Sequence, residues 1–386
     1  MKTQRINLYL LTIILLLTSL LLLDKRFMPA KTPQPQFSPS SPELISTVMR
    51  LIKTDYLEEP NPNRTIEGAF RGLINSLDPL SAYLDKDLAA KYQKKKAKTA
   101  STGLIIFKRY GVFPVVVSLL ENSPAARAGL RVGDNISAIN DRNPMNFSQL
   151  ETNLLLEADP DKNGREPLKL RVVRGTETME FEVTRDFIAP TTLQITARPS
   201  QLVSLKPSFI YQGLSQEIKK SLSLYLKKGA APKAVVLDLR DCWTGDYEEA
   251  RKIINLFLKE EEAGYFERRG QKQPFSCPDK PDFPNLPLIV WVNQATYGPA
   301  EVVAGVLKDL GRAKVIGTAT PGLAGKQESF PLPDGSLVVL TTAVFSLKSG
   351  TKLWDNSLPL DEKLSFTQDL EKAYLDKTLS LITVKN

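Results

Sequence analysis

The sequence predicts a multidomain protein that joins an α+β part to an α/β core, and three observations lead to this fold class. Its 386 residues exceed what one hydrophobic core usually holds, so two or three domains are expected. Residues 102–186 carry short β-rich runs separated by turns, which is typical of a small sheet domain. From Phe187 onward, apolar runs of strand length alternate with helical patterns, which predicts a mostly parallel sheet covered by helices.

Residues 1–28 predict a membrane anchor or signal segment. Residues 8–23 form an apolar run of 16, between the ~17–20 residues of a membrane span and the ~7–15 of a signal-peptide core. The charged residues that follow offer no small-residue cleavage site, so we favour an uncleaved anchor over a removed signal peptide. Lys2 and Arg5 then place the folded part outside the cytoplasm, in the periplasm or its equivalent, with the lipid membrane as a partner.

The rest of the chain divides into four predicted parts. Residues 29–42 are proline-rich and predict a stiff tether. Residues 43–100 predict a helical segment, which Ser41 and Pro42 open with an N-cap and a first-position proline. Residues 101–187 form the small sheet domain, and residues 188–386 form the α/β core.

Composition excludes several kinds of chemistry. The chain has no histidine, which removes Ser-His-Asp and Cys-His catalysis and imidazole metal sites, so we expect no metal ion and no cofactor. The formal charge of +8 comes without aromatic residues interleaved among basic ones, and the basic run at 94–98 is interpreted as a solvated helix end. We therefore expect no nucleic-acid partner. Cys242 and Cys277 form either one disulfide or two separate thiols.

The stretch at residues 286–309 organises the core. It predicts a buried strand, a short turn and a helix that begins at Pro299, with Glu301 in its first turn. A strand that ends at a helix N-terminus is where α/β enzymes place nucleophiles. Gly298 stands at that place here, and glycine has no side chain to react.

Four motifs carry a family resemblance: DPLSAYL at 78–84, SPAARAGLRVGDNISAIN at 123–140, AVVLDLRD at 234–241 and VNQATYGPAEVVAGVLKD at 292–309. Together they resemble the C-terminal (tail-specific) processing peptidases, which are membrane-tethered or secreted serine proteases with an embedded PDZ domain. The resemblance covers nearly all of the chain after the tether. It implies a PDZ-like fold for residues 101–187 and a crotonase/Clp-like peptidase core for residues 188–386.

The resemblance also implies a Ser nucleophile and a Lys base, and both positions depart from that pattern. The nucleophile aligns with Gly298 and the base with Leu323, which cannot accept a proton. The oxyanion region aligns with Thr244 and Gly245 and with the start of the helix at Pro299. We interpret the chain as a pseudopeptidase, in which Tyr297 fills the emptied pocket and Glu301 serves the helix N-terminus.

Three functions remain open at this stage. The first is a polypeptide-binding adaptor or regulator that does not cleave, with an active relative or a second copy of the chain as a further partner. The second is an active endopeptidase whose dyad has moved, for which Thr296 and Lys326 are the candidates. The third is a scaffold that uses only the PDZ surface.

The PDZ-like domain is expected to bind polypeptide C-termini or unstructured segments by adding a strand to its sheet. The loop that would hold the peptide aligns with Gly103, Leu104, Ile105 and Ile106. Ile105 replaces a glycine of the family pattern, which narrows the loop.

Overall fold

The computed structural model describes residues 42–94, 100–158, 167–187, 193–227, 232–365 and 369–383. The predicted anchor, nearly all of the tether and most of the basic run at 94–98 lie outside these residues. Within them, no helix combines the length and apolar character needed to span a bilayer. The chain divides into two compact units, residues 1–65 and 66–386.

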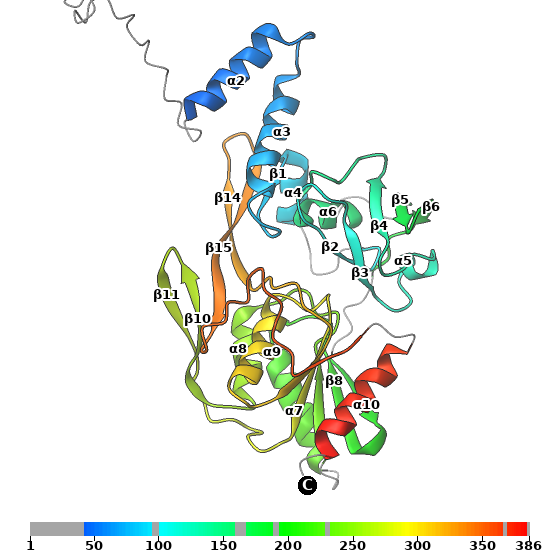
Figure 1. Ribbon diagram of the computed structural model, residues 1–386, viewed down its shortest axis with the longest axis vertical. Coiled ribbons are helices and arrows are strands. Elements are labelled where there is room, and N and C mark those ends of the chain that lie inside the picture. Colours follow the sequence, from blue (N-terminus) through cyan, green and yellow to red (C-terminus); the bar gives the residue numbers. More distant parts are fainter. Residues whose placement is uncertain are drawn as a thin grey trace, which may run out of the picture. The chain divides into compact units, whose positions relative to one another are not determined.

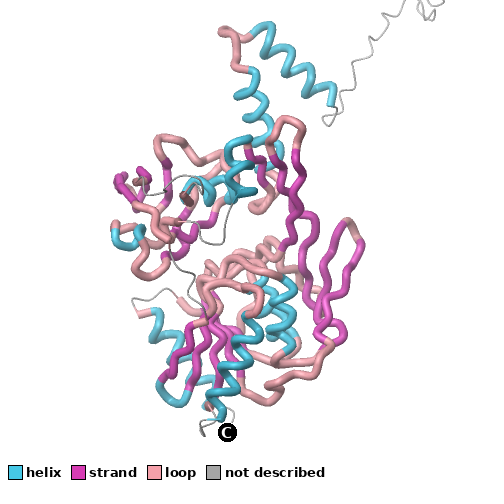
Figure 2. The backbone as a smooth tube through the Cα atoms, turned by 180° about the vertical axis from the view of Figure 1, so that it is seen from behind, coloured by secondary structure: helices cyan, strands magenta, loops and turns pink. Residues whose placement is uncertain are grey.

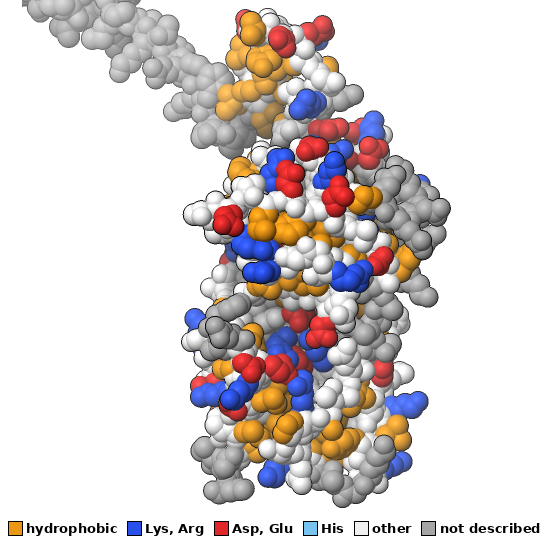
Figure 3. All heavy atoms as spheres, turned by 90° about the vertical axis from the view of Figure 1, so that its right-hand side faces the viewer, with side chains coloured by type: hydrophobic (Ala, Val, Ile, Leu, Met, Phe, Trp, Pro, Cys, Tyr) orange, Lys and Arg blue, Asp and Glu red, His pale blue; other side chains and the backbone are white. Residues whose placement is uncertain are grey.

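In the first unit the structure describes helix α2 (Pro42–Asp55) and the first turn of α3 (Pro62–Asn75). The predicted helix start at Pro42 is confirmed, with Glu43 in the first turn. The apolar stripe of α2 is exposed: Ile45 is 58% and Val48 46% accessible. Figure 3 shows apolar side chains gathered over this helical region at the top of the view.

In the second unit the DPLS motif forms a tight polar turn between α3 and strand β1 (Ala82–Leu84). The carboxylate of Asp78 accepts hydrogen bonds from the Leu80 N–H, the Ser81 N–H and the Ser81 hydroxyl, at 2.7–2.8 Å. Helix α4 (Lys86–Lys94) follows β1. The turn thereby delivers β1 to the long strand β15 (Leu337–Leu347), with which β1 pairs antiparallel.

The small sheet domain is a five-stranded antiparallel sheet in the order β2-β3-β4-β5-β6. Its strands are β2 (Leu104–Phe107), β3 (Val115–Leu119), β4 (Asn135–Ile139), β5 (Leu168–Arg174) and β6 (Glu177–Val183). Two helices accompany it, α5 (Pro124–Arg127) and α6 (Gln149–Leu156). Helix α6 starts in a capping box, in which Ser148 accepts the Glu151 N–H and Glu151 accepts the Ser148 N–H.

The core contains a six-stranded sheet in the order β16-β13-β12-β9-β8-β7. Four of its pairings are parallel, and only β7 runs antiparallel to its neighbour. The strands are β7 (Gln194–Arg198), β8 (Leu202–Lys206), β9 (Ala234–Asp238), β12 (Leu288–Val292), β13 (Lys314–Gly317) and β16 (Glu362–Lys363). The 3-10 turn η1 (Pro199–Gln201) joins β7 to β8. Figures 1 and 2 show helices beside this sheet in both views: α7 (Leu214–Lys227), α8 (Tyr247–Asn255), α9 (Pro299–Asp309) and α10 (Leu370–Thr383).

A second sheet corrects the expectation of a mostly parallel core, because all of its pairings are antiparallel. Its order is β1-β15-β10-β11, with β14 also on β15. The hairpins β10 (Glu260–Arg268)–β11 (Gln271–Cys277) and β14 (Gly325–Pro331)–β15 are closed by short turns, which only antiparallel neighbours allow. An isolated parallel bridge joins Ile210 to Gly245.

Candidate functional site

The candidate site lies where β12 ends and α9 begins. Gly298 is the N-cap of α9, with φ 65° and ψ −128°, and Pro299 is the first helical residue. A β-carbon built on Gly298 would lie 3.9 Å from the hydroxyl of Tyr247 and 4.0 Å from the carbonyl oxygen of Leu323. The structure therefore brings together Gly298 and Leu323, the residues that the family resemblance assigns to the nucleophile and base positions.

Glu301 ties these two positions to each other. Its Oε2 accepts the N–H of Gly298 at 3.2 Å and that of Leu323 at 2.8 Å, and its Oε1 accepts the N–H of Gly322 at 2.8 Å. The prediction that Glu301 serves the start of α9 is confirmed, and the side chain does more, because it also holds the loop of the base position. Burial raises the pKa of Glu301 to about 7, although the Thr320 hydroxyl and these N–H groups oppose the rise.

Leu323 has no group that could accept a proton. Leu323 is 1% exposed, and its backbone forms an isolated antiparallel β-bridge with Trp354. Tyr247, which faces the position from α8, donates its hydroxyl to the carbonyl of Gly325 at 3.0 Å, and burial raises its pKa well above the ordinary value. A phenol with a raised pKa holds its proton at neutral pH and does not act as a base.

The two rescue candidates are engaged with other groups. The Thr296 hydroxyl donates to the Leu239 carbonyl at 2.8 Å and accepts the N–H of Asn293 at 2.9 Å. The Lys326 ammonium lies 3.9 Å from the ring centroid of Phe266, and burial lowers its pKa. Thr296 thus stabilises its own turn, while Lys326 rests on an aromatic face of the antiparallel sheet.

The residues assigned to the oxyanion region are hydrogen-bonded to the segment around Ile210. The Thr244 carbonyl accepts the N–H of Ile210 at 3.1 Å, and the N–H of Asp246 donates to the Ile210 carbonyl at 2.8 Å. A β-carbon on Gly245 would lie 2.5 Å from that carbonyl oxygen, so only glycine fits here. Pro299 has no N–H to offer as an oxyanion donor.

Two backbone N–H groups of the PDZ loop donate hydrogen bonds to hydroxyl groups of neighbouring residues. The N–H of Gly103 donates to the Ser101 hydroxyl at 3.2 Å, and the N–H of Leu104 lies 3.4 Å from that of Thr102. Ile105 packs with Val117 and Ala295 and against Trp243, whereas Leu104 and Ile106 belong to the apolar core of the sheet domain. The side chain of Ile105 is thus directed at the peptidase core.

Sequence reasoning missed one contact that joins the two domains at the site. Gln149, the first residue of α6, donates its Nε2 to the Tyr297 hydroxyl at 2.7 Å, and both side chains are buried. Tyr297 also lies next to Trp243, with ring centroids 6.4 Å apart. Gln149 and Tyr297 are 148 positions apart in the sequence, and no local sequence pattern predicts a contact between such distant residues.

Cys242 and Cys277 are two separate buried thiols. Burial raises the pKa of both, that of Cys277 to about 12, so neither is ionised at neutral pH. Of the two arrangements that the sequence leaves open, the structure has the separate thiols.

Two protein-family models match parts of the chain. Residues 207–362 match the model of peptidase family S41, and residues 115–159 match that of the PDZ domain. The chain contains a peptidase family S41 domain. Two relatives of this S41 protein are the carboxy-terminal processing protease CtpA of Bacillus subtilis (strain 168) and the carboxy-terminal-processing protease of Bartonella bacilliformis. The first is 26% identical over 329 residues, covering 84% of this chain and 69% of the relative. The second is 28% identical over 321 residues, covering 79% and 71%.

A solved structure supports the same fold. The photosystem II D1 C-terminal processing protease superposes on the S41 chain with a TM-score of 0.67 and 20% sequence identity, covering 83% of this chain and 86% of that one. The PDZ domain and the peptidase family both fit the binding of polypeptide C-termini.

Proposed function

We propose that this S41 homologue binds polypeptide chains through its PDZ domain, does not cleave them, and acts as an adaptor or regulator. The observation that carries the proposal is the pair Gly298 and Leu323, held by one carboxylate at the two positions where a dyad would stand. Peptide hydrolysis by a serine-type mechanism needs a nucleophilic oxygen and a group that takes its proton. A hydrogen atom and an alkyl chain supply neither.

The rival reading, an endopeptidase with a relocated dyad, needs Thr296 and Lys326 to meet. Thr296 already uses its hydroxyl as a donor to Leu239 and as an acceptor from Asn293. Lys326 belongs to β14, where its ammonium faces Phe266. Both residues would have to give up these contacts before they could act together.

The test is incubation of the purified full-length chain with an unstructured peptide that has an apolar C-terminal tail. We expect saturable binding and no fragments. Time-dependent fragments that disappear in Thr296→Ala or Lys326→Ala would establish the rival. Fragments that persist in both variants point to a contaminating protease, which an unrelated protein from the same preparation controls.

A second arm restores the dyad with Gly298→Ser and Leu323→Lys together, each single change serving as the matched control. We expect weak cleavage from the double variant and none from either single variant. Thr244 and Tyr297 are unchanged, and loss of one oxyanion donor costs about 2.7–4 kcal/mol in such reactions. Activity of the double variant equal to that of an active relative would show that these two alterations do not matter.

We also propose that residues 1–28 anchor the chain in the membrane and that the folded part lies outside the cytoplasm. The apolar run at 8–23 and the basic residues before it support this. The full-length chain is expected in the membrane fraction and a chain that starts at residue 29 in the soluble one; equal distribution would contradict the anchor.

An active relative or a second copy of the chain is the further partner that we propose for the adaptor, and co-elution in size-exclusion chromatography tests it.

A further inference from the structure

A buried side chain, that of Gln149, lies at one end of the open edge of the PDZ sheet. β2 is the edge strand of the five-stranded sheet, and α6 packs against it. In strand addition, the peptide runs antiparallel to such an edge strand, its carboxylate at the loop that precedes the strand. Here that loop is at Gly103, so the residues before the peptide's C-terminus extend toward Lys108.

The direction of the backbone groups along β2 is set by its pairing with β3. The carbonyl of Gly103 accepts the N–H of Leu120 and therefore points to the β3 side. Backbone groups alternate in direction along a strand, so those of Leu104, Ile106 and Lys108 point to the open edge. These three residues offer the hydrogen-bonding groups that an added strand would use.

The last of these positions is occupied. The N–H of Lys108 donates to Oε1 of Gln149 at 3.1 Å, and Nε2 of the same amide donates to the Tyr297 hydroxyl at 2.7 Å. Because a backbone N–H can only donate, the orientation of the amide is determined. The Gln149 side chain thus crosses from the first residue of α6 to the end of β2.

Both ends of this crossing are buried and fixed. Gln149 is 4% exposed, Lys108 1% and Tyr297 6%. The Lys108 ammonium is held in turn by the carbonyls of Arg109 and Met145. A peptide that displaced Gln149 could accept the Lys108 N–H itself, but it would separate the Gln149 amide from the Tyr297 hydroxyl and leave both without partners in a buried place. That loss exceeds the gain from one more strand hydrogen bond with a peptide.

We infer that Gln149, anchored by Tyr297, is a stop that confines a bound peptide to its last few residues. Only β2 itself, Leu104–Phe107, remains for strand pairing, which corresponds to about four peptide residues, one opposite each strand residue. The inference rests on the proposed function and narrows it. The partner is recognised by a short C-terminal tail, and a longer unstructured segment gains nothing by extending along β2.

The experiment measures dissociation constants of the full-length chain for peptides of two, four, six and eight residues. All share one apolar C-terminal sequence with a free carboxylate and grow at the N-terminus. We expect affinity to rise from two to four residues and then to change less than about twofold. In Gln149→Ala, the eight-residue peptide should bind at least tenfold more tightly than the four-residue one.

Tyr297→Phe provides a second variant, because it keeps the ring and removes only the hydroxyl that anchors Gln149. It should show the same gain with length, in smaller measure. Asn153→Ala, an amide-to-methyl change on the same helix, should behave as the wild type does.

Two outcomes would overturn the inference, and they are distinct. If the wild-type affinity keeps improving from four to eight residues, Gln149 is not a stop, while the proposed function still holds. Absence of binding at every length, for peptides with a free carboxylate and with an amidated end alike, removes the proposed function and the stop with it.

Discussion

At Gly298 the backbone adopts φ 65° and ψ −128°, a conformation that residues with a β-carbon rarely take. Such a conformation costs a non-glycine residue about 1–3 kcal/mol and persists only where the surroundings enforce it. Nucleophile turns between a strand and a helix carry strain of this kind. The chain keeps the turn, and glycine relieves its strain.

Gly298→Ala should therefore lower the free energy of unfolding by about 1–3 kcal/mol, measured by urea denaturation. Strain is the cause rather than a clash, since the added β-carbon would meet its nearest neighbours at 3.9 and 4.0 Å. Gly68→Ala in α3, where a β-carbon meets open space and φ is ordinary, is the matched control and should stabilise the fold slightly. Equal stability of Gly298→Ala and the wild type would show that the turn relaxes at no cost.

Glu301 should make stability depend on pH. Burial raises its folded-state pKa from 4.5 to about 7, so below pH 4.5 the carboxyl holds its proton in both the folded and the unfolded state. Between these two pKa values only the folded state holds it. The free energy of unfolding therefore falls as pH rises, by up to ~1.4 kcal/mol per pH unit, and the contribution is lost above the folded pKa.

Glu301→Gln isolates this contribution because an amide does not titrate. The difference in unfolding free energy between wild type and Glu301→Gln should shrink as pH rises from 5 toward 7, as followed by urea denaturation. A difference that stays constant from pH 5 to 7 and shrinks only as pH falls below 4.5 would mean that the three N–H donors hold the carboxylate ionised and that its pKa lies below the ordinary value.

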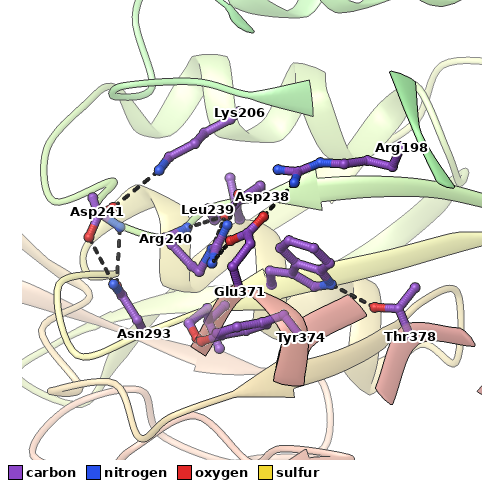
Figure 4. A network of polar contacts seen from close by, with 12 residues as sticks. Arg198, Lys206, Asp238, Leu239, Arg240, Asp241, Asn293, Glu371, Tyr374 and Thr378 are labelled. Atoms are coloured by element: carbon purple, nitrogen blue, oxygen red, sulfur yellow. Dashed lines mark hydrogen bonds and ion pairs between the residues drawn. The ribbon is translucent and has the colours of Figure 1, made fainter. Parts of the chain in front are cut away.

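At the scale of elements, α10 is bound to the parallel sheet through one arginine. The Arg240 guanidinium, just after β9, lies 4.7 Å from the ring centroid of Trp291 on β12 and 4.6 Å from that of Tyr374 on α10. It also pairs with Asp238 at 2.6 Å and with Glu371 of α10 at 2.8 Å (Figure 4). An arginine between two rings and two carboxylates joins three elements, which lysine could not do in the same geometry.

Elements whose signals are local could be predicted from the sequence, and pairings between distant segments could not. The start of α9 at Pro299 and the start of α2 at Pro42 follow from proline at the first helical position, and both are confirmed. The antiparallel sheet that contains the hairpins β10–β11 and β14–β15 was not predicted, because an apolar run does not reveal the direction of its neighbour.

The same limit applies to the site. Alignment to a family motif assigns Gly298 and Leu323 to the two catalytic positions, and this assignment stays a prediction. The Glu301 carboxylate, which joins these two residues, accepts a hydrogen bond from Leu323, 22 positions further along the chain. The Gln149 amide makes its hydrogen bond to Tyr297 in the other domain. Such contacts depend on three-dimensional packing, which the spacing of residues along the chain does not encode locally.

At the scale of the whole molecule, the PDZ domain and the peptidase core share a junction within the second unit. The Ser118 hydroxyl on β3 donates to Asp241 at 2.6 Å, and the Gln294 side chain donates to the Val117 carbonyl at 3.0 Å. Asp241 in turn accepts from Asn293 at 2.8 Å, on the core side of the junction (Figure 4). Trp243 packs against the apolar cluster of Ile105, Val117 and Ala295 between them.

These contacts should make the two domains unfold together. In calorimetry the wild type is expected to show one transition for residues 66–386, because a buried apolar cluster and several hydrogen bonds couple the two cores. The double variant Trp243→Ala, Ser118→Ala removes the ring and the hydroxyl from the junction and should split the transition in two. Trp354→Ala, a matched change that lies in the peptidase core, should lower the transition temperature and keep a single transition. Two transitions already in the wild type would mean that the junction does not couple the domains, and the Gln149–Tyr297 contact would then be too weak to hold the peptide stop in place.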